Sequence, residues 1–178
     1  MKIGIIGAGR IGKVHGESIT NYIQGVSVAA MADPYWTEDS IKWAKNMGIP
    51  TCNDYHDILN DPSIDAVLIC SSTQTHAKVS VEAIRAGKNV FCEKPISHYL
   101  PEIKEVMQEL EKNHVKYQVG FNRRFDHNFR AVHDAVKDGK IGDVQIVKIT
   151  SRDPDAPPID YIKVSGGLFM DMMIHDFD

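Results

Sequence analysis

Short apolar stretches alternate with segments of helical periodicity along residues 2–120. Five stretches have the length and apolar content of β-strands: Lys2–Ile6 and residues 26–32, 66–70, 89–92 and 116–119. The first three are nearly all apolar, which is typical of parallel strands that are covered on both faces. We therefore expect a parallel sheet at the centre of this region.

The segments between these stretches have the pattern of amphipathic helices. Ile103, Val106 and Leu110 repeat at helical spacing among charged residues, and further helices are predicted around residues 41–48 and 75–86. A regular alternation of strand and helix predicts an α/β fold with a doubly wound parallel sheet.

The pattern changes after Gly120. A helical repeat through residue 136 is followed by alternating apolar positions over residues 144–150, which predict a half-exposed strand. The last segment, residues 168–178, predicts a largely buried helix. Because a single strand does not form a stable sheet, we expect one complete domain over residues 1–120 and the truncated start of an α+β domain over residues 121–178.

Composition narrows the class of partner. The 178 residues include 20 Lys and Arg against 24 Asp and Glu, and the net charge of −4 argues against binding to nucleic acid or an anionic membrane. No apolar run approaches the roughly 18 residues of a membrane span. The three cysteines form no C-x-x-C pair, which favours reduced thiols in a cytoplasmic protein and gives no zinc spacing.

Three glycines, Gly7, Gly9 and Gly12, follow the first predicted strand at the spacing G-x-G-x-x-G and open the next helix. The first permits a tight turn, the second lets the backbone approach a pyrophosphate, and the third allows close packing of helix on strand. With the intervening Arg10 and Ile11, they predict a dinucleotide site at a helix N-terminus in a Rossmann-type sheet. The alternative is a glycine-rich turn without a ligand.

Asp33 ends the second predicted strand, at the spacing from the glycines where a carboxylate accepts the ribose hydroxyls of adenosine. A 2′-phosphate would meet this negative charge and needs a nearby arginine, but Pro34, Tyr35 and Trp36 follow. The sequence therefore favours NAD over NADP.

Polar residues also follow the third predicted strand. Ser71, Thr73 and His76 stand where open α/β sheets bind ligands, and they are candidates for contact with the cofactor. The alternative is local, because Thr73 or Thr75 would equally cap the helix that follows.

Glu93 and Lys94 come directly after the fourth predicted strand and precede Pro95, and both are candidates for contact with the cofactor near its nicotinamide. A lysine at this edge can bind a substrate hydroxyl and stabilise the alkoxide that forms as hydride leaves. Pro95 suggests an unusual turn with a cis bond as one option. Taken alone, Lys94 would be interpreted as a solvated turn lysine.

The final predicted helix carries Asp171, His175 and Asp178 at spacings of four and three, which places them on one face. An aspartate beside a histidine can orient the imidazole so that it accepts a hydroxyl proton. An ion pair or a metal site is the alternative, but no further ligands stand at matching spacing. The other histidines, including His15, have no acid at helical spacing and are interpreted as solvated or structural.

These motifs together resemble the superfamily of glucose–fructose oxidoreductase, inositol dehydrogenase and MocA, and within it the inositol 2-dehydrogenases. The resemblance covers the whole chain and rests on the glycine motif, Asp33-Pro34, Glu93-Lys94-Pro95 and the segment from Gly166 to His175, with further support from residues 120–126 and 151–154. It implies that the chain is an N-terminal fragment of a homo-oligomeric enzyme.

The resemblance also implies a chemistry. Lys94, Asp171 and His175 would form the catalytic group, and Arg124 and Asp153 would join Asp171 and His175 in binding a cyclic polyol or sugar. The expected reaction is NAD-dependent oxidation of a hydroxyl, with myo-inositol as the leading substrate. The alternatives are a non-catalytic NAD-binding module and a dehydrogenase of another sugar.

Overall fold

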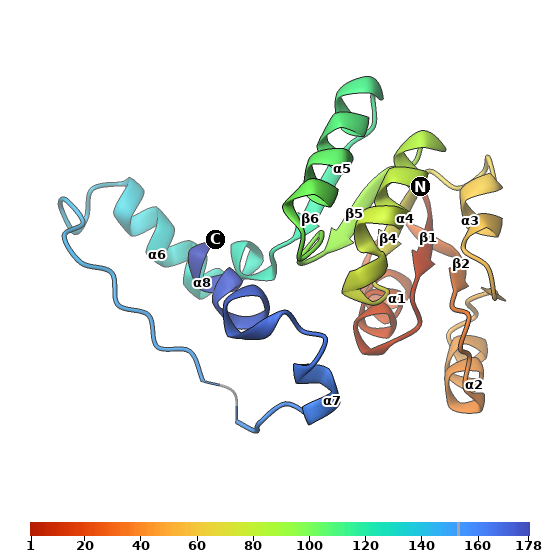
Figure 1. Cartoon of the computed structure of the whole chain (residues 1–178), viewed down its shortest axis with the longest axis horizontal. Helices are drawn as coiled ribbons and strands as arrows, with labels where there is room; N and C mark the ends of the chain where they lie inside the picture. The colour runs from red at the N-terminus through yellow and green to blue at the C-terminus, as the bar shows by residue number, and fades with distance from the viewer. Residues whose placement is uncertain (153) are drawn as a thin grey trace. The chain divides into compact units, whose positions relative to one another are not determined.

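The computed structural model describes residues 1–152 and 154–178, which divide into two compact units, Met1–Gly120 and Phe121–Asp178. The first unit contains a six-stranded parallel sheet in the order β3-β2-β1-β4-β5-β6 (Figure 1). This doubly wound order confirms the α/β fold class that the sequence predicts. The strands are β1 (Lys2–Ile6), β2 (Ser27–Ala32), β3 (Thr51–Cys52), β4 (Ala66–Ile69), β5 (Asn89–Glu93) and β6 (Tyr117–Gly120).

Five of these strands agree with their predicted positions to within one residue at each end. The edge strand β3 has only two residues, too few to show a periodicity, and the sequence did not predict it. The helices of this unit are α1 (Arg10–Tyr22), α2 (Glu38–Asn46), α3 (His56–Asn60), α4 (Thr73–Arg85) and α5 (Leu100–Lys112).

Two apolar clusters cover the two faces of the sheet. One joins α1 and α2 to inward residues such as Ile5 and Leu68, and the other joins α3, α4 and α5 to their strand neighbours Ile6 and Ile69. Because successive strand residues point to opposite faces, one apolar strand supplies both clusters. The sheet is thereby covered on both sides, and its carboxyl edge is left for polar loops.

The second unit contains short helical segments: η1 (Asn122–Phe125), α6 (His127–Lys137), α7 (Ile159–Ile162), the π-helical turn η2 (Phe169–Met173) and α8 (Ile174–Phe177). The Asp126 carboxylate accepts hydrogen bonds from the backbone N–H groups of Asn128 and Phe129 and so caps α6.

Two expectations for the second unit are wrong. Residues 144–150 form no strand, and their side chains are exposed, because the described residues offer no neighbouring strand to pair with them. The last helical segment is not buried either, since Leu168 is 62% exposed and Phe169 is 64% exposed. Within the described ranges, no helix is long and apolar enough to cross a membrane.

Candidate functional site

The turn after β1 has a backbone that requires glycine. Gly7 has a φ of 107°, and its N–H donates a hydrogen bond to the carbonyl of Ala32 over 2.8 Å. A Cβ at Gly7 would lie 2.6 Å from the backbone of Cys70 and Ser71. Gly7 thus allows the loop after β1 to pass close to the end of β4.

The other two glycines differ in what surrounds them. A Cβ at Gly12 would overlap the carbonyl oxygen of Gly7, so Gly12 permits α1 to pack on the turn. A Cβ at Gly9 would meet no atom within 4 Å, so Gly9 faces open space at the start of α1. Arg10 is exposed there, and Ile11 packs against the core. The turn from Gly7 to Gly12 at the start of α1, called the glycine cradle below, fits a dinucleotide pyrophosphate. Such a group needs close approach to the backbone and to N–H donors.

Asp33 holds this cradle in place. One carboxylate oxygen accepts a hydrogen bond from the Ala8 N–H over 2.7 Å, and the other accepts one from the Tyr35 N–H over 2.8 Å. A carboxylate has about four acceptor positions, so these two bonds leave capacity for ribose hydroxyls.

The loop after β4 is organised by hydroxyl groups. The Thr75 hydroxyl donates to the carbonyl of Ser72 over 2.8 Å and lies 2.7 Å from the hydroxyl oxygen of Ser71. Ser72 is the N-cap of α4 and makes no side-chain cap bond, so the predicted capping role of Thr73 or Thr75 is wrong. Thr73 is the first residue of α4 and is partly exposed.

His76 is only 2% exposed. Its Nδ1 lies 2.8 Å from the carbonyl oxygen of Pro95, and its Nε2 lies 3.0 Å from that of Ser71. Both ring nitrogens therefore face backbone atoms, an arrangement that favours a structural role over the expected contact with a cofactor.

Glu93 ends β5, and a cis peptide bond joins Lys94 to Pro95. One Glu93 carboxylate oxygen lies 2.7 Å from Nε2 of His15 on α1. This pair was not predicted, because no acid stands at helical spacing from His15 in the sequence. The available signal was the position of His15 one helical turn after Gly12, which directs it toward the same edge of the sheet.

The cysteines near this edge are unsuited to act as nucleophiles. Burial raises the pKa of the Cys92 thiol to about 11, and burial also raises the pKa of Cys70. Both thiols are therefore protonated at neutral pH. No cluster of His, Cys, Asp and Glu suited to a metal occurs in residues 1–152 and 154–178.

In the second unit, Arg124 and His175 line the same pocket of about 330 Å³. Arg124 donates three hydrogen bonds to the Asp178 carboxylate over 2.6–2.9 Å, and Arg123 pairs with Asp176. These arginine partners were not predicted, because they lie more than 50 positions away in the sequence.

Asp171 accepts a hydrogen bond from the Tyr161 hydroxyl over 2.8 Å. Asp171 and Asp178, expected on one helix face, thus have different partners, and a π-helical turn over Phe169–Met173 interrupts the regular helical spacing. The substrate candidate Asp153 lies outside the described residues.

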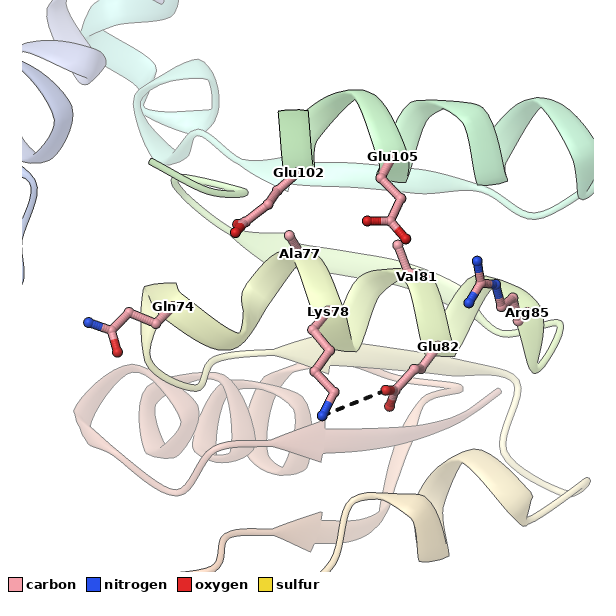
Figure 2. A pocket seen from close by; sticks show the side chains of 8 residues that line it. All are labelled: Gln74, Ala77, Lys78, Val81, Glu82, Arg85, Glu102 and Glu105. Atoms are coloured by element: carbon pink, nitrogen blue, oxygen red, sulfur yellow. Dashed lines mark ion pairs between the residues drawn. The ribbon is translucent and has the colours of Figure 1, made fainter. Parts of the chain in front are cut away.

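In the first unit, a groove of about 250 Å³ lies between α4 and α5 (Figure 2). Ala77 and Val81 point from α4 toward α5, and the charged residues around them include the ion pair between Lys78 and Glu82 at 4.0 Å. None of the residues that the sequence singles out lines this groove.

Comparison with known families decides the relationship. Residues 1–121 match the model of an oxidoreductase family with an NAD-binding Rossmann fold, and residues 129–178 match the GFO/IDH/MocA C-terminal domain. The chain belongs to the GFO/IDH/MocA family. This confirms the resemblance seen in the motifs.

Several GFO/IDH/MocA relatives are similar over the whole chain. The myo-inositol 2-dehydrogenase of Thermotoga maritima is 46% identical, and the inositol 2-dehydrogenase of Rhizobium meliloti is 45% identical. The solved scyllo-inositol dehydrogenase of Lactobacillus casei, with bound NAD(H) and scyllo-inositol, is 36% identical over 99% of the chain, with a TM-score of 0.89. The chain spans 53%, 53% and 54% of these proteins, about half of each.

Proposed function

We propose that the chain forms the NAD-binding part of a dehydrogenase that oxidises a hydroxyl of a cyclic polyol, with myo-inositol as the first candidate. The observation that carries this proposal is the glycine cradle anchored by Asp33 at the sheet edge where Lys94 begins its turn. The names of the similar relatives support inositols as the substrate class.

The residues around the cradle would hold NAD, which accepts a hydride when bound. The open space at Gly9 and the N–H groups that begin α1 at Arg10 would receive the pyrophosphate. Asp33 would accept the adenosine ribose hydroxyls, and its charge would disfavour a 2′-phosphate. Ser71, Thr73 and Glu93 would contact the nicotinamide half.

In this mechanism Lys94 binds the reacting hydroxyl oxygen, and its ammonium stabilises negative charge as the C–H bond is broken. His175 accepts the hydroxyl proton, and Asp171 holds the His175 imidazole in the orientation that accepts it. Arg124 and Asp153 are the proposed contacts to the other substrate hydroxyls. The hydroxyl carbon becomes a ketone, so a keto-inositol is the product.

The test measures NAD binding by calorimetry and NADH formation with myo-inositol in the same preparation. Lys94→Ala and His175→Ala should each lower kcat by about 10²–10⁴, the range for loss of a positioned acid–base group, with far less change in NAD affinity. Near-wild-type turnover in either variant would refute its assigned role.

A second candidate is a non-catalytic NAD-binding module, for which the glycine turn and Asp33 would suffice. Binding of NAD without turnover of any inositol would support this candidate. Turnover of another sugar in preference to myo-inositol would support a dehydrogenase whose substrate is that sugar.

A further inference from the structure

The residues on either side of Lys94 in the sequence are each held by a histidine from an earlier helix. Glu93 is contacted by His15 of α1, and the carbonyl of Pro95 is contacted by His76 of α4. Neither histidine has a part in the proposed mechanism. Their shared target is the turn that presents Lys94.

His76 links two loops at the carboxyl edge of the sheet. Its ring lies between the carbonyl oxygens of Ser71, after β4, and Pro95, after β5. A carbonyl oxygen only accepts hydrogen bonds, so the imidazole is the donor. A neutral ring donates from one nitrogen and a protonated ring donates from both, and in either state the buried ring fills the space between the loops.

His15 restrains the other side of the turn. Its ring packs edge-on against Phe91 with the ring centroids 5.4 Å apart, and this contact directs Nε2 to Glu93. The Glu93 carboxylate lies beside Gly120, where an added Cβ would come within 3.1 Å of Oε2, so a glycine at this position leaves room for the carboxylate.

We propose that His15 and His76 are positioning residues that together fix the Lys94 turn. His76 holds it through the Pro95 carbonyl, and His15 holds it through the Glu93 side chain. The importance of this restraint for catalysis rests on the proposed function of Lys94. The restraint itself is a property of the first unit and is testable without turnover.

Two substitutions of His76 separate its two contacts. The amide nitrogen of Asn stands as many bonds from the backbone as Nδ1, whereas that of Gln stands as many bonds away as Nε2. His76→Asn should therefore place an N–H donor opposite the Pro95 carbonyl, and His76→Gln should place one opposite the Ser71 carbonyl only. At His15, Gln retains a donor for Glu93, and Ala removes it.

The readout is the rate at which the Lys94 amine is acetylated, measured by mass spectrometry relative to exposed Lys104 in the same molecule. We expect His76→Gln and His15→Ala to raise this relative rate about fivefold, the factor that accompanies loss of an ordinary hydrogen bond. His76→Asn and His15→Gln should stay close to wild type, as should His114→Ala, which changes an exposed histidine.

Equal rates in His76→Asn and His76→Gln, together with no effect of His15→Ala, would overturn the proposal. If the His76 variants unfold, the comparison of His15→Ala with His15→Gln still tests the proposal. Because His15 is partly exposed, we expect these two variants to fold. NAD affinity is measured separately. The expected labelling pattern without NAD binding would reject the proposed function alone, whereas NAD binding without the pattern would reject the positioning role alone.

Discussion

At the residue scale, Asp33 combines two tasks that a single carboxylate can perform. Its oxygens accept hydrogen bonds from the N–H groups of Ala8 and Tyr35, which ties the glycine turn to the end of β2. Its negative charge is also the feature of this loop that would exclude a 2′-phosphate. An asparagine at position 33 would keep one acceptor oxygen for these N–H groups, but it would carry no charge to repel a 2′-phosphate.

We therefore expect the wild-type chain to bind NAD at least about tenfold more tightly than NADP, a difference of about 1.4 kcal/mol. Asp33→Asn should narrow this ratio, because the charge is removed while an acceptor oxygen remains. Asp33→Ala should narrow it too and also loosen the turn. Calorimetric titration with both cofactors measures the ratio, and equal or tighter binding of NADP to wild type would contradict the assignment.

Gly9 and Gly12 should respond differently to the same substitution. Gly9→Ala should leave the free energy of unfolding unchanged, since its Cβ would meet no neighbouring atom. It should weaken NAD binding by about tenfold or more, because the ligand needs that space. Gly12→Ala should lower the free energy of unfolding by about 1–3 kcal/mol, because its Cβ would overlap Gly7.

Urea unfolding and NAD titration of the two variants provide the comparison, each serving as the control for the other. Unchanged NAD affinity in Gly9→Ala would show that the pyrophosphate does not approach this position.

At the element scale, α4 and α5 are joined by a buried acid. Glu109 on α5 accepts a hydrogen bond from Arg85 of α4 over 3.1 Å and another from Lys112 over 2.7 Å. These bonds, first that of Arg85 and then that of Lys112, lower the pKa of Glu109 from 4.5 to about 2. Because the folded state favours the ionised carboxylate, this contribution to stability is complete above pH 4.5 and declines as the pH falls toward 2.

Glu109→Gln should accordingly lower the urea midpoint at pH 7, and the difference from wild type should shrink as the pH falls from 4.5 toward 2. Glu111→Gln, which changes an exposed acid of the same helix, should have little effect at either pH. A Glu109→Gln deficit that is independent of pH would mean that packing, and not ionisation, is the cause.

At the scale of the whole molecule, the second unit exposes many apolar side chains. Ile146 is 88% exposed and Val147 is 73% exposed, and residues of α6 and α7 add to this surface. Apolar surface of this extent promotes association. We expect light scattering to show a mass that rises with protein concentration.

Replacing Ile146 and Val147 together with lysine should reduce that association, whereas Tyr22→Lys, at an exposed apolar position in the first unit, should not. A monodisperse monomer at all concentrations of the wild-type chain would contradict the expectation.

The first unit was predictable because its signals are local. Apolar runs marked five strands, and the glycine spacing marked the turn whose positive φ and close approaches the structure shows. The second unit was less predictable. The alternation over residues 144–150 indicated a strand, but a strand needs a hydrogen-bonding neighbour, and the described residues contain none for it.

The sequence by itself determined the parallel α/β sheet, the glycine turn with Asp33, and membership of the GFO/IDH/MocA family, since each depends on residue type and short spacing. Only the tertiary structure decided the partners of His15 and His76, which lie 78 and 19 positions away, and the separate partners of Asp171 and Asp178. The physical reason is that a hydrogen bond depends on where folding brings two atoms, and no local pattern in the chain encodes that distance.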